Sequence, residues 1–286
     1  MGLPPLDKYD TVVLGGGGVK CIATLGALQY IYDSDKHLGV HTYIGTSAGA
    51  IIGFLMGIGY TPIELITYIC TSHIFESIMP LDMMSLVTGN GAIKYVDKID
   101  APLRKLVSEK IGRTDLTLKE LYDTLGVVLV CATYNITHGR CEYLTYKTHP
   151  NLECLVAVRM SSSLPLIFDE CMYDGSIYID GGAADNFPIT CADPGACVFG
   201  VAIFTTYNHN SSNKITTLLR LLISSSSNMY IRRIISLFSE KHALLSIELE
   251  NVDLLEFDRS NSSKLDLFSK GYNSCVDFFK QLEYLE

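Results

Sequence analysis

The chain has 286 residues, of which 48% are hydrophobic, and a formal net charge of −9 at pH 7. This length and composition suffice for one large α/β domain. No linker or internal repeat divides the chain, so we expect residues 1–286 to form a single domain. The negative charge disfavours nucleic acid as a partner and gives no general attraction to anionic membranes.

No signal for secretion or membrane insertion is recognised in the sequence. Residues 1–7 have neither a basic start nor an apolar core, and the longest apolar run, 48–60, is shorter than the ~18 residues of a spanning helix. The nine cysteines, an odd number without a disulfide framework, indicate reduced thiols. We therefore expect a soluble, cytoplasmic protein.

A glycine loop joins the first predicted strand to the first predicted helix. Residues 10–14 predict a buried strand, and residues 21–32 predict an amphipathic helix. Consecutive glycines and the start of a helix can together present backbone N–H groups to an anion. The loop therefore indicates either an oxyanion hole formed by Gly16, Gly17 and Gly18 or a turn that only packs the helix on the strand.

Two other anion sites do not fit this loop. A Walker loop requires Gly-Lys-Ser/Thr, whereas Lys20 stands between Val19 and Cys21. The dinucleotide fingerprint that starts at Gly16 also fails at Cys21, where it requires glycine. Nucleotide and dinucleotide phosphates are therefore disfavoured as ligands.

The next segment predicts a nucleophile elbow at Ser47. Residues 41–44 predict a short strand and residues 48–56 a buried helix, with Gly45-Thr-Ser-Ala-Gly49 between them. A sharp strand-to-helix turn leaves no room for side chains two positions before and after its central residue, which Gly45 and Gly49 satisfy. A plain tight turn remains the alternative.

The rest of the chain continues the α/β pattern after a less regular insertion. Apolar runs at 126–132 and 196–204 predict buried parallel strands, and helical spacing from about 265 to 285 predicts a closing helix. Asp180 stands where a strand ends in Gly181-Gly182, either as a carboxylate facing a cleft or as part of a hairpin turn.

In chain order, these segments resemble the patatin-like phospholipase family. That family has a Gly-Gly-Gly-x-Arg/Lys-Gly loop, a Gly-x-Ser-x-Gly elbow, an Ala/Ser-rich turn ending in Pro-x-x-Phe, and an Asp-Gly-Gly/Ala motif. The corresponding segments are 16–21, 45–49, 161–168 and 180–182, and Asn186 and Pro188 fit the usual continuation. The resemblance spans about residues 9–204, and one departure is Cys21 in place of the last loop glycine.

The resemblance implies a three-layer α/β/α fold with a mostly parallel central sheet. Its motif-bearing core covers about 9–204, and a helical completion covers about 214–286. The resemblance also implies a Ser–Asp dyad. Ser47 is the nucleophile, Asp180 the general base, Gly16 to Gly18 the oxyanion hole, and Lys20, Gly45, Gly49, Gly181 and Gly182 support these motifs. No cofactor or metal is implied.

Three alternatives accompany this hypothesis. A Ser-Asp-His triad is open, because His209 and His242 follow Asp180 in the chain. An acyltransferase or thioesterase could use the same dyad on another acceptor. A catalytically idle lipid-binding protein is the third.

The substrate class implied is phospholipid or another acyl ester, reached through peripheral, transient membrane contact. Two stretches could form the contact face: residues 78–87, which include Met83 and Met84, and residues 218–238, which combine arginines with aliphatic side chains. Core packing is the alternative for both stretches.

Overall fold

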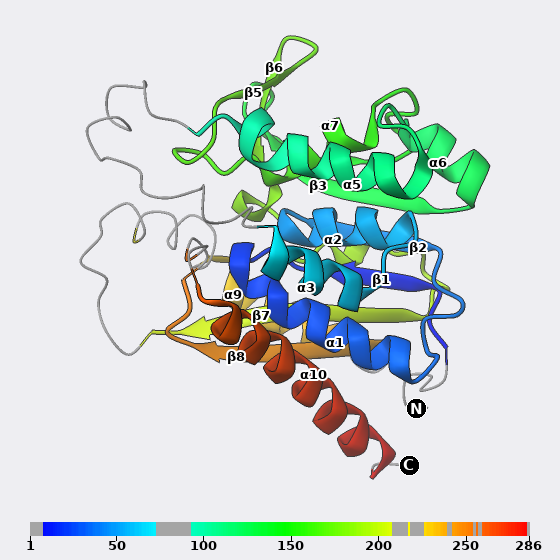
Figure 1. Cartoon of the computed structure of the whole chain (residues 1–286), viewed down its shortest axis with the longest axis vertical. Coiled ribbons are helices and arrows are strands. Elements are labelled where there is room, and N and C mark those ends of the chain that lie inside the picture. Colours follow the sequence, from blue (N-terminus) through cyan, green and yellow to red (C-terminus); the bar gives the residue numbers. More distant parts are fainter. Residues whose placement is uncertain are drawn as a thin grey trace.

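Eight strands form one central sheet in the part of the chain that the structure describes (Figure 1). This computed structural model describes residues 8–72, 93–207, 217, 226–238, 242–253, 256 and 259–284. The strand order is β5-β6-β3-β2-β1-β7-β8, with β4 paired to β3 beside this path. The strands are β1 Thr11–Leu14, β2 Thr42–Thr46, β3 Val128–Asn135, β4 Arg140–Leu144, β5 Cys171–Tyr173, β6 Ser176–Asp180, β7 Val198–Thr206 and β8 Ala243–Glu250.

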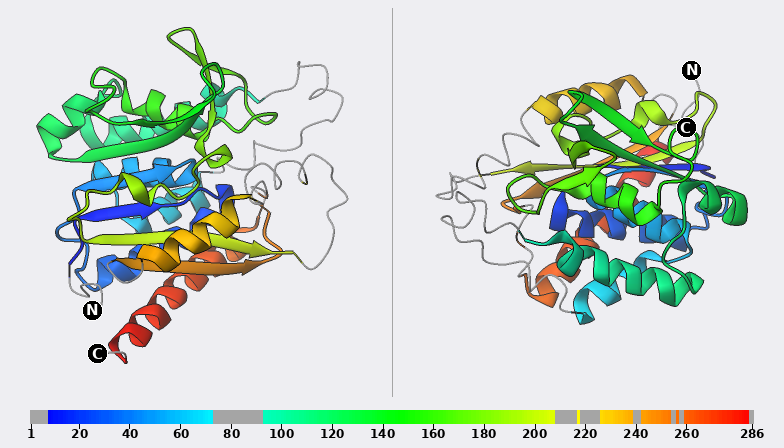
Figure 2. Two further views of the ribbon diagram at one scale, coloured as in Figure 1. Left: turned by 180° about the vertical axis from the view of Figure 1, so that it is seen from behind. Right: turned by 90° about the horizontal axis from the view of Figure 1, so that it is seen from above.

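Helices cover both faces of this sheet (Figure 2). The described helices are α1 Cys21–Asp33, α2 Ala48–Gly57, α3 Pro62–Thr71, α5 Ala101–Ile111, α6 Leu118–Leu125, α7 Cys154–Ser162, α9 Ser226–Phe238 and α10 Asn261–Glu283. Short helical turns are η1 Gly18–Lys20, η3 Val96–Asp100, η4 Gly181–Ala183 and η5 Ile189–Cys191. The predicted three-layer fold with a mostly parallel sheet is confirmed.

Alternation along the strands explains the two packed faces. Val12 and Leu14 of β1 belong to the larger core beneath α1 and α2, whereas Val13 belongs to a second core that includes Ile231 of α9. Successive side chains of a strand point to opposite faces, so a strand between two helical layers is buried at every position and mostly apolar. All four residues of β1 are accordingly buried.

The topology places the site at one edge of the sheet. Strands β1, β2, β3, β7 and β8 are parallel, so their carboxyl ends share an edge. The chain passes from β1 to its neighbour β2 on one side and later enters β7 on the other. Ligands of open α/β sheets bind at such a switch point, outside the carboxyl ends of the strands. The glycine loop after β1 lies there.

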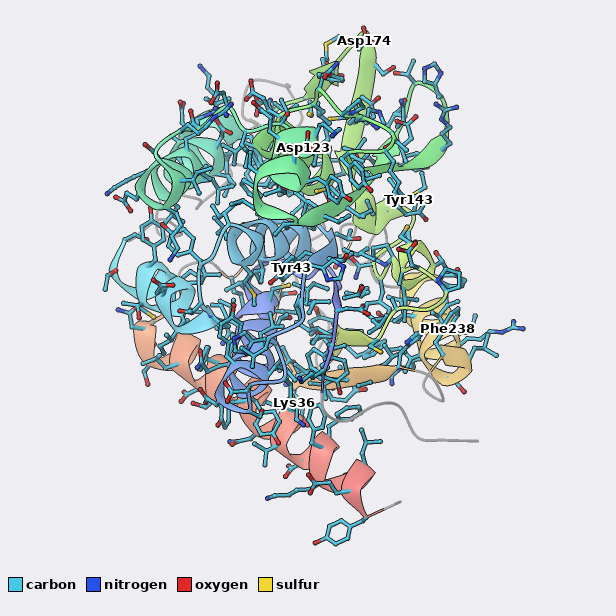
Figure 3. The ribbon with its side chains drawn as sticks, turned by 90° about the vertical axis from the view of Figure 1, so that its right-hand side faces the viewer. Lys36, Tyr43, Asp123, Tyr143, Asp174 and Phe238 are labelled. Atoms are coloured by element: carbon cyan, nitrogen blue, oxygen red, sulfur yellow. The ribbon has the colours of Figure 1, made fainter. Side chains whose placement is uncertain are left out.

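The C-terminal helix closes the larger core by packing on α1. A Cβ added to Gly26 of α1 would lie 1.8 Å from the Phe268 carbonyl oxygen of α10, and one added to Gly271 would lie 1.8 Å from the Ala23 oxygen. The two helix backbones therefore touch where these glycines cross. Figure 3 shows Lys36 beside α10, where its Nζ lies 5.1 Å from the Phe279 ring centroid.

Most predicted elements are confirmed, and one region is corrected. The segments predicted as strands at 10–14, 41–44, 126–132 and 196–204 overlap β1, β2, β3 and β7, and the predicted C-terminal helix is α10. However, the helical completion expected over about 214–286 includes residue 243, whereas Ala243 begins β8, which pairs with β7 in parallel. The expected helical completion from about 214 to 286 therefore contains a sheet strand.

Candidate active site

Ser47 lies on a strained turn between β2 and α2. Its φ of 56° and ψ of −125° place this non-glycine residue in a region that L residues rarely adopt. A Cβ added at Gly45 would lie 2.5 Å from the Ala50 nitrogen, and one at Gly49 would lie 2.4 Å from the Leu14 carbonyl oxygen. The elbow therefore requires both glycines because backbone approaches backbone on each side of Ser47.

A second serine holds this turn in place. The Ser47 N–H donates to Ser161 Oγ at 3.0 Å, and the Ser161 hydroxyl donates to the Ala132 carbonyl oxygen at 2.6 Å. Ser161 lies at the end of α7 and is fully buried. One hydroxyl thus ties the elbow to β3, using both its donor and its acceptor capacity.

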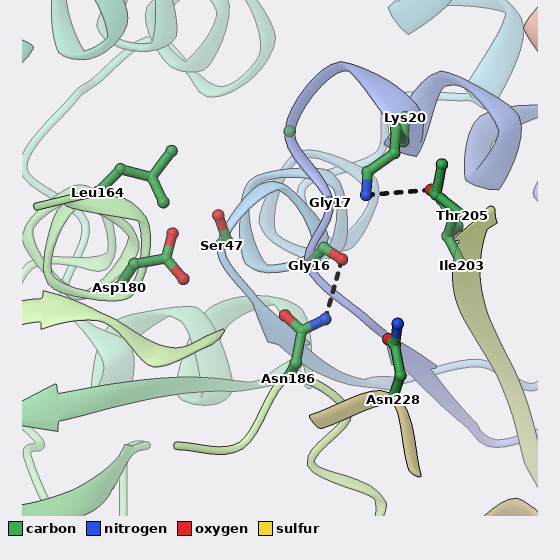
Figure 4. Close-up of a pocket in the computed structure, with 11 residues that line it drawn as sticks. Gly16, Gly17, Lys20, Ser47, Leu164, Asp180, Asn186, Ile203, Thr205 and Asn228 are labelled. Atoms are coloured by element: carbon green, nitrogen blue, oxygen red, sulfur yellow. Dashed lines mark hydrogen bonds between the residues drawn. The ribbon is translucent and has the colours of Figure 1, made fainter. Parts of the chain in front are cut away.

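Asp180 ends β6 at the level of the elbow. It pairs with Thr133 of β3, whose preceding residue Ala132 pairs with Thr46 of β2. Two strand spacings, about 10 Å, separate the two backbones, so both side chains must reach across β3. Figure 4 shows the Asp180 carboxylate and the Ser47 hydroxyl pointing toward one another.

The Asp180 carboxylate is buried and only partly hydrogen-bonded. Oδ1 accepts the Gly182 N–H at 2.8 Å, whereas Oδ2 is buried without a full hydrogen bond. Burial raises the pKa of Asp180 to about 6, against the opposing effects of the Ser47 hydroxyl and the Gly182 N–H. A Cβ on Gly181 would lie 2.2 Å from the Ala132 oxygen, so this glycine is needed for close approach to β3.

The glycine loop presents N–H groups beside Ser47. The Gly16 N–H is already used, because it donates to the Asn186 carbonyl oxygen at 3.2 Å. Asn186 Nδ2 in turn donates to the Gly16 carbonyl oxygen at 3.2 Å. Within the described residues, no acceptor takes the N–H groups of Gly17 and Gly18. Of the three glycines predicted to form an oxyanion hole, Gly17 and Gly18 therefore remain candidates as donors. The N–H of Gly16 instead fixes the loop to Asn186.

A small polar pocket of about 20 Å³ brings these groups together (Figure 4). Lys20 is buried at its rim, where Nζ donates to Thr205 Oγ1 of β7 at 3.3 Å. The pocket is lined by Gly16, Gly17, Gly18, Lys20, Ser47, Leu164, Asp180, Asn186, Ile203, Thr205 and Asn228. The structure thus places the predicted nucleophile, base, loop glycines and Lys20 around one space.

An apolar cavity of about 120 Å³ adjoins the polar pocket at Ser47. Gly18, Ser47 and Leu164 line both this cavity and the polar pocket. Cys21 also lines the cavity, and its Sγ lies 3.6 Å from the Gly15 carbonyl oxygen. Burial raises the pKa of Cys21 to about 12, so its thiol stays protonated at neutral pH.

Asn186 and Ser161 are the residues whose roles at the site the sequence did not reveal. Both fall within the motifs, but no local spacing signals that they bond to Gly16 and to Ser47.

The fold argues against His242 as the histidine of a Ser-Asp-His triad. His242 precedes β8, at the amino edge of the sheet, whereas Ser47 follows β2 at the carboxyl edge. His209 lies outside the described residues.

The remaining sequence predictions concern a metal site, a membrane-spanning helix and a membrane-contact face. No cluster of three His, Cys, Asp or Glu side chains there could hold a metal ion. None of the described helices is long and apolar enough to cross a membrane. The stretch with Met83 and Met84 lies outside the described residues. In α9, Ile231 is buried against the sheet, while Met229 and Tyr230 are 79% and 50% exposed.

The chain belongs to the patatin-like phospholipase family. The model of that family, described as patatin-like phospholipase, matches residues 12–193, more than half of the chain. The match begins in β1 and extends past Asp180, so it covers the glycine loop, the elbow and the aspartate.

Two viral proteins are similar to this chain in sequence. "Probable lipid hydrolase 463L" of Invertebrate iridescent virus 6 is 32% identical over 188 residues, which are 64% of this chain and 63% of that protein. The chain therefore matches just under two thirds of that relative's length. "Uncharacterized protein R571" of Acanthamoeba polyphaga mimivirus is 26% identical, with 94% of this chain and 93% of that protein covered.

Two solved structures share the fold. VipD from Legionella pneumophila superimposes with a TM-score of 0.61 at 16% identity, covering 96% of this chain and 67% of VipD. Full-length ExoU in complex with SpcU, from the type III secretion system of Pseudomonas aeruginosa, gives a TM-score of 0.54 at 12% identity. That match covers 98% of this chain and 53% of the other. At these identities the likeness shows the fold alone.

Proposed function

We propose that the protein is a lipid acyl hydrolase that cleaves acyl esters, phospholipids included, with Ser47 and Asp180 as a catalytic dyad. One observation carries this proposal. A buried carboxylate with an unsatisfied oxygen points at the hydroxyl of a serine on a strained elbow. Such a serine is activated by an adjacent base, and the base works best with a pKa near the operating pH.

Each group has a defined step in this hydrolysis. Ser47 Oγ attacks the ester carbonyl carbon while its proton passes to Asp180 Oδ2. The tetrahedral oxyanion is stabilised by the N–H groups of Gly17 and Gly18, aided by the start of α1. Collapse of this intermediate breaks the bond to the alcohol, which leaves with the proton from Asp180. Asp180 then takes a proton from the water that attacks the acyl carbon, and it gives this proton to Ser47 Oγ as the acyl–serine bond breaks and the fatty acid leaves.

Family membership and the lipid hydrolase relative support this proposal. The first alternative is transfer of the acyl group to an acceptor other than water, through the same acyl-serine. The second is lipid binding without catalysis. Burial of an ionisable carboxylate against Ser47 is costly without a function, which favours an active site over an idle one.

The test is release of fatty acid from mixed phospholipid vesicles and from p-nitrophenyl butyrate. Ser47→Ala and Asp180→Asn are expected to lose activity by about a thousandfold or more on both substrates. His209→Ala and His242→Ala are expected to keep it, and a chelator is expected to be harmless. Loss of activity in either histidine variant would indicate a triad.

Product analysis separates the alternatives. With a competing alcohol present, an acyltransferase would form the new ester in excess of free acid, whereas a hydrolase forms mainly acid. A wild-type protein that binds vesicles but releases nothing would favour lipid binding alone.

A substrate in a membrane can be reached only through peripheral contact with its surface. The exposed side chains of Met229 and Tyr230 in α9 are candidates for this contact, because the neighbouring Asn228 lines the polar pocket.

A further inference from the structure

A second apolar cavity continues the one beside Ser47. Its volume is about 100 Å³, and it shares five lining residues with the first cavity. The shared residues are Leu25, Ile51, Ile52, Ile69 and Ile99. The two cavities therefore meet at a common wall of aliphatic side chains.

The order of residues along α2 gives the direction of this double cavity. Ala48 lines only the cavity beside Ser47, Ile51 and Ile52 line both cavities, and Leu55 lines only the second. The same order holds on the facing helices. Along α5 and the turn before it, Tyr95 lines the first cavity and Leu103 and Leu106 the second. The space thus extends along α2, away from the nucleophile.

The chemistry of the walls defines the occupant. No charged side chain lines either cavity among the described residues, and the polar groups at its near end belong to Ser47, Ser162 and Tyr95. The Tyr95 and Ser162 hydroxyls bond to each other at 2.6 Å, so they are satisfied within the wall. Such a space accepts an unbranched hydrocarbon, and its near end is at the atom that would attack the ester carbonyl.

We propose that the two cavities form one acyl-chain channel that holds about the first eight carbons of the acyl chain, so that the gain from chain length levels off near eight carbons. This inference rests on the proposed function. From Ala48 to Leu55 the channel extends along α2 for about 10 Å. An extended chain advances roughly 3.5 Å for every three bonds, so about eight acyl carbons fill this length. Side chains lining only the second cavity, Leu55, Leu65, Leu103 and Leu106 among them, set the limit.

The expected effect of chain length follows from hydrophobic transfer. Each methylene removed from water strengthens binding roughly fourfold. The value of kcat/KM is therefore expected to rise from p-nitrophenyl butyrate to the octanoate and to gain little more with the palmitate. Extra carbons beyond the channel add no buried surface.

The test changes the far end of the channel at Leu103. Leu103→Phe fills the second cavity and is expected to lower the octanoate-to-butyrate ratio of kcat/KM about tenfold, the loss of roughly two bound methylenes. Leu103→Ala enlarges it and is expected to raise the palmitate-to-octanoate ratio. Leu65→Phe, which enters the same cavity from α3, provides a second variant where Leu103→Phe does not fold.

Matched controls use Leu121 of α6, which is fully buried but does not line the channel. Leu121→Phe and Leu121→Ala disturb the core to a similar degree and are expected to leave both ratios within about twofold. Ratios do not depend on the fraction of folded enzyme. The channel is overturned if the Leu103 and Leu65 variants scale all three esters equally, as the Leu121 variants do.

A binding measurement separates this inference from the proposed function. Butanoic, octanoic and hexadecanoic acids displace a fluorescent fatty acid from the Ser47→Ala protein, and Leu103→Phe in that background is expected to weaken octanoic acid selectively. Where the wild type cleaves no ester but this selectivity holds, the channel stands and the hydrolase proposal fails. Absence of selective binding overturns the channel even where ester cleavage is observed.

Discussion

The Ser47 N–H donates to Ser161 Oγ at 3.0 Å, across 114 positions of sequence. This bond fixes the backbone of a residue whose φ of 56° is unfavourable for an L residue. Because Ser161 also donates to the Ala132 oxygen, the elbow is tied to the strand that separates Ser47 from Asp180. We infer that Ser161 is a positioning residue for the proposed dyad.

Replacing Ser161 with alanine removes this tie without touching the substrate. Ser161→Ala is expected to lower kcat by about ten- to a hundredfold with little change in KM, because one buried hydrogen bond of about 1–3 kcal/mol no longer orients Ser47. Steady-state kinetics on p-nitrophenyl butyrate measure this split.

The matched control is Ser163→Ala, which removes a buried hydroxyl that donates to the carbonyl oxygen of Arg159, in the preceding helix α7, at 2.8 Å. This variant is expected to keep kcat within about threefold. Equal losses in the two variants, in proportion to their loss of stability, would mean that Ser161 only supports folding.

The rate should depend on pH through Asp180. A general base is active only when ionised, and the pKa of Asp180 is raised to about 6 by burial. We therefore expect kcat/KM for p-nitrophenyl butyrate to rise about tenfold per pH unit below pH 6 and to level off above it. An acid limb centred near pH 4, the usual range of an exposed carboxyl, would contradict the role of this buried group.

Local motifs allowed the candidate site to be predicted from sequence. The elbow glycines stand two residues from Ser47, and the glycine loop is continuous, so their spacing is visible without a structure. The bonds between Ser161 and Ser47 and between Asn186 and Gly16 join distant parts of the chain. No spacing encodes such contacts, because they depend on how β2, β3 and α7 come together.

Hydrophobic periodicity alone could not predict two further features of the fold, the strand β8 and the apolar cavities. Ala243, Leu244 and Leu245 form a continuous apolar run, which a buried parallel strand and a buried helix share. Their pairing with β7 decides for the strand. The apolar cavities could not be predicted from the sequence for a related reason. Ile51, Ile52 and Leu55 have the same spacing whether they pack against a neighbouring helix or line a cavity.

The elbow glycines should tolerate no side chain. A Cβ at Gly49 would lie 2.4 Å from the Leu14 carbonyl oxygen and one at Gly45 2.5 Å from the Ala50 nitrogen. Because both neighbours are backbone atoms, we expect Gly45→Ala and Gly49→Ala each to lower the free energy of unfolding by about 3 kcal/mol or more and to abolish activity. Urea denaturation measures the loss. Gly195→Ala, which meets no atom within 4 Å, should be silent.

The crossing of α1 and α10 predicts a loss of stability far from the site. A methyl group at Gly26 or Gly271 would lie 1.8 Å from a carbonyl oxygen of the other helix, so the helices would have to separate. We expect either alanine variant to lower the melting temperature by roughly 10 °C or more. Limited proteolysis should then cut α10 first. A melting temperature equal to that of Gly195→Ala would show that the helices do not pack this closely in solution.

The ionised form of Asp180, which the proposed reaction requires, should lower the stability of the folded protein. Its pKa is raised from 3.8 to about 6 by burial, so the folded protein binds a proton more tightly than the unfolded chain does. The stabilising contribution of the protonated carboxyl is complete below about pH 4 and is lost as the pH rises through 6. Above that range the ionised group costs up to about 3 kcal/mol.

Asp180→Asn removes this ionisation while its amide oxygen can still accept the Gly182 N–H. At pH 7.5 the variant is therefore expected to unfold at a higher temperature than the wild type, and the difference should shrink toward zero near pH 4. Thermal melts at both pH values measure the effect. A variant that is inactive yet no more stable at pH 7.5 would mean that the ionised carboxylate is compensated within the fold, and that Ser47 and Gly182 stabilise it more than burial penalises it.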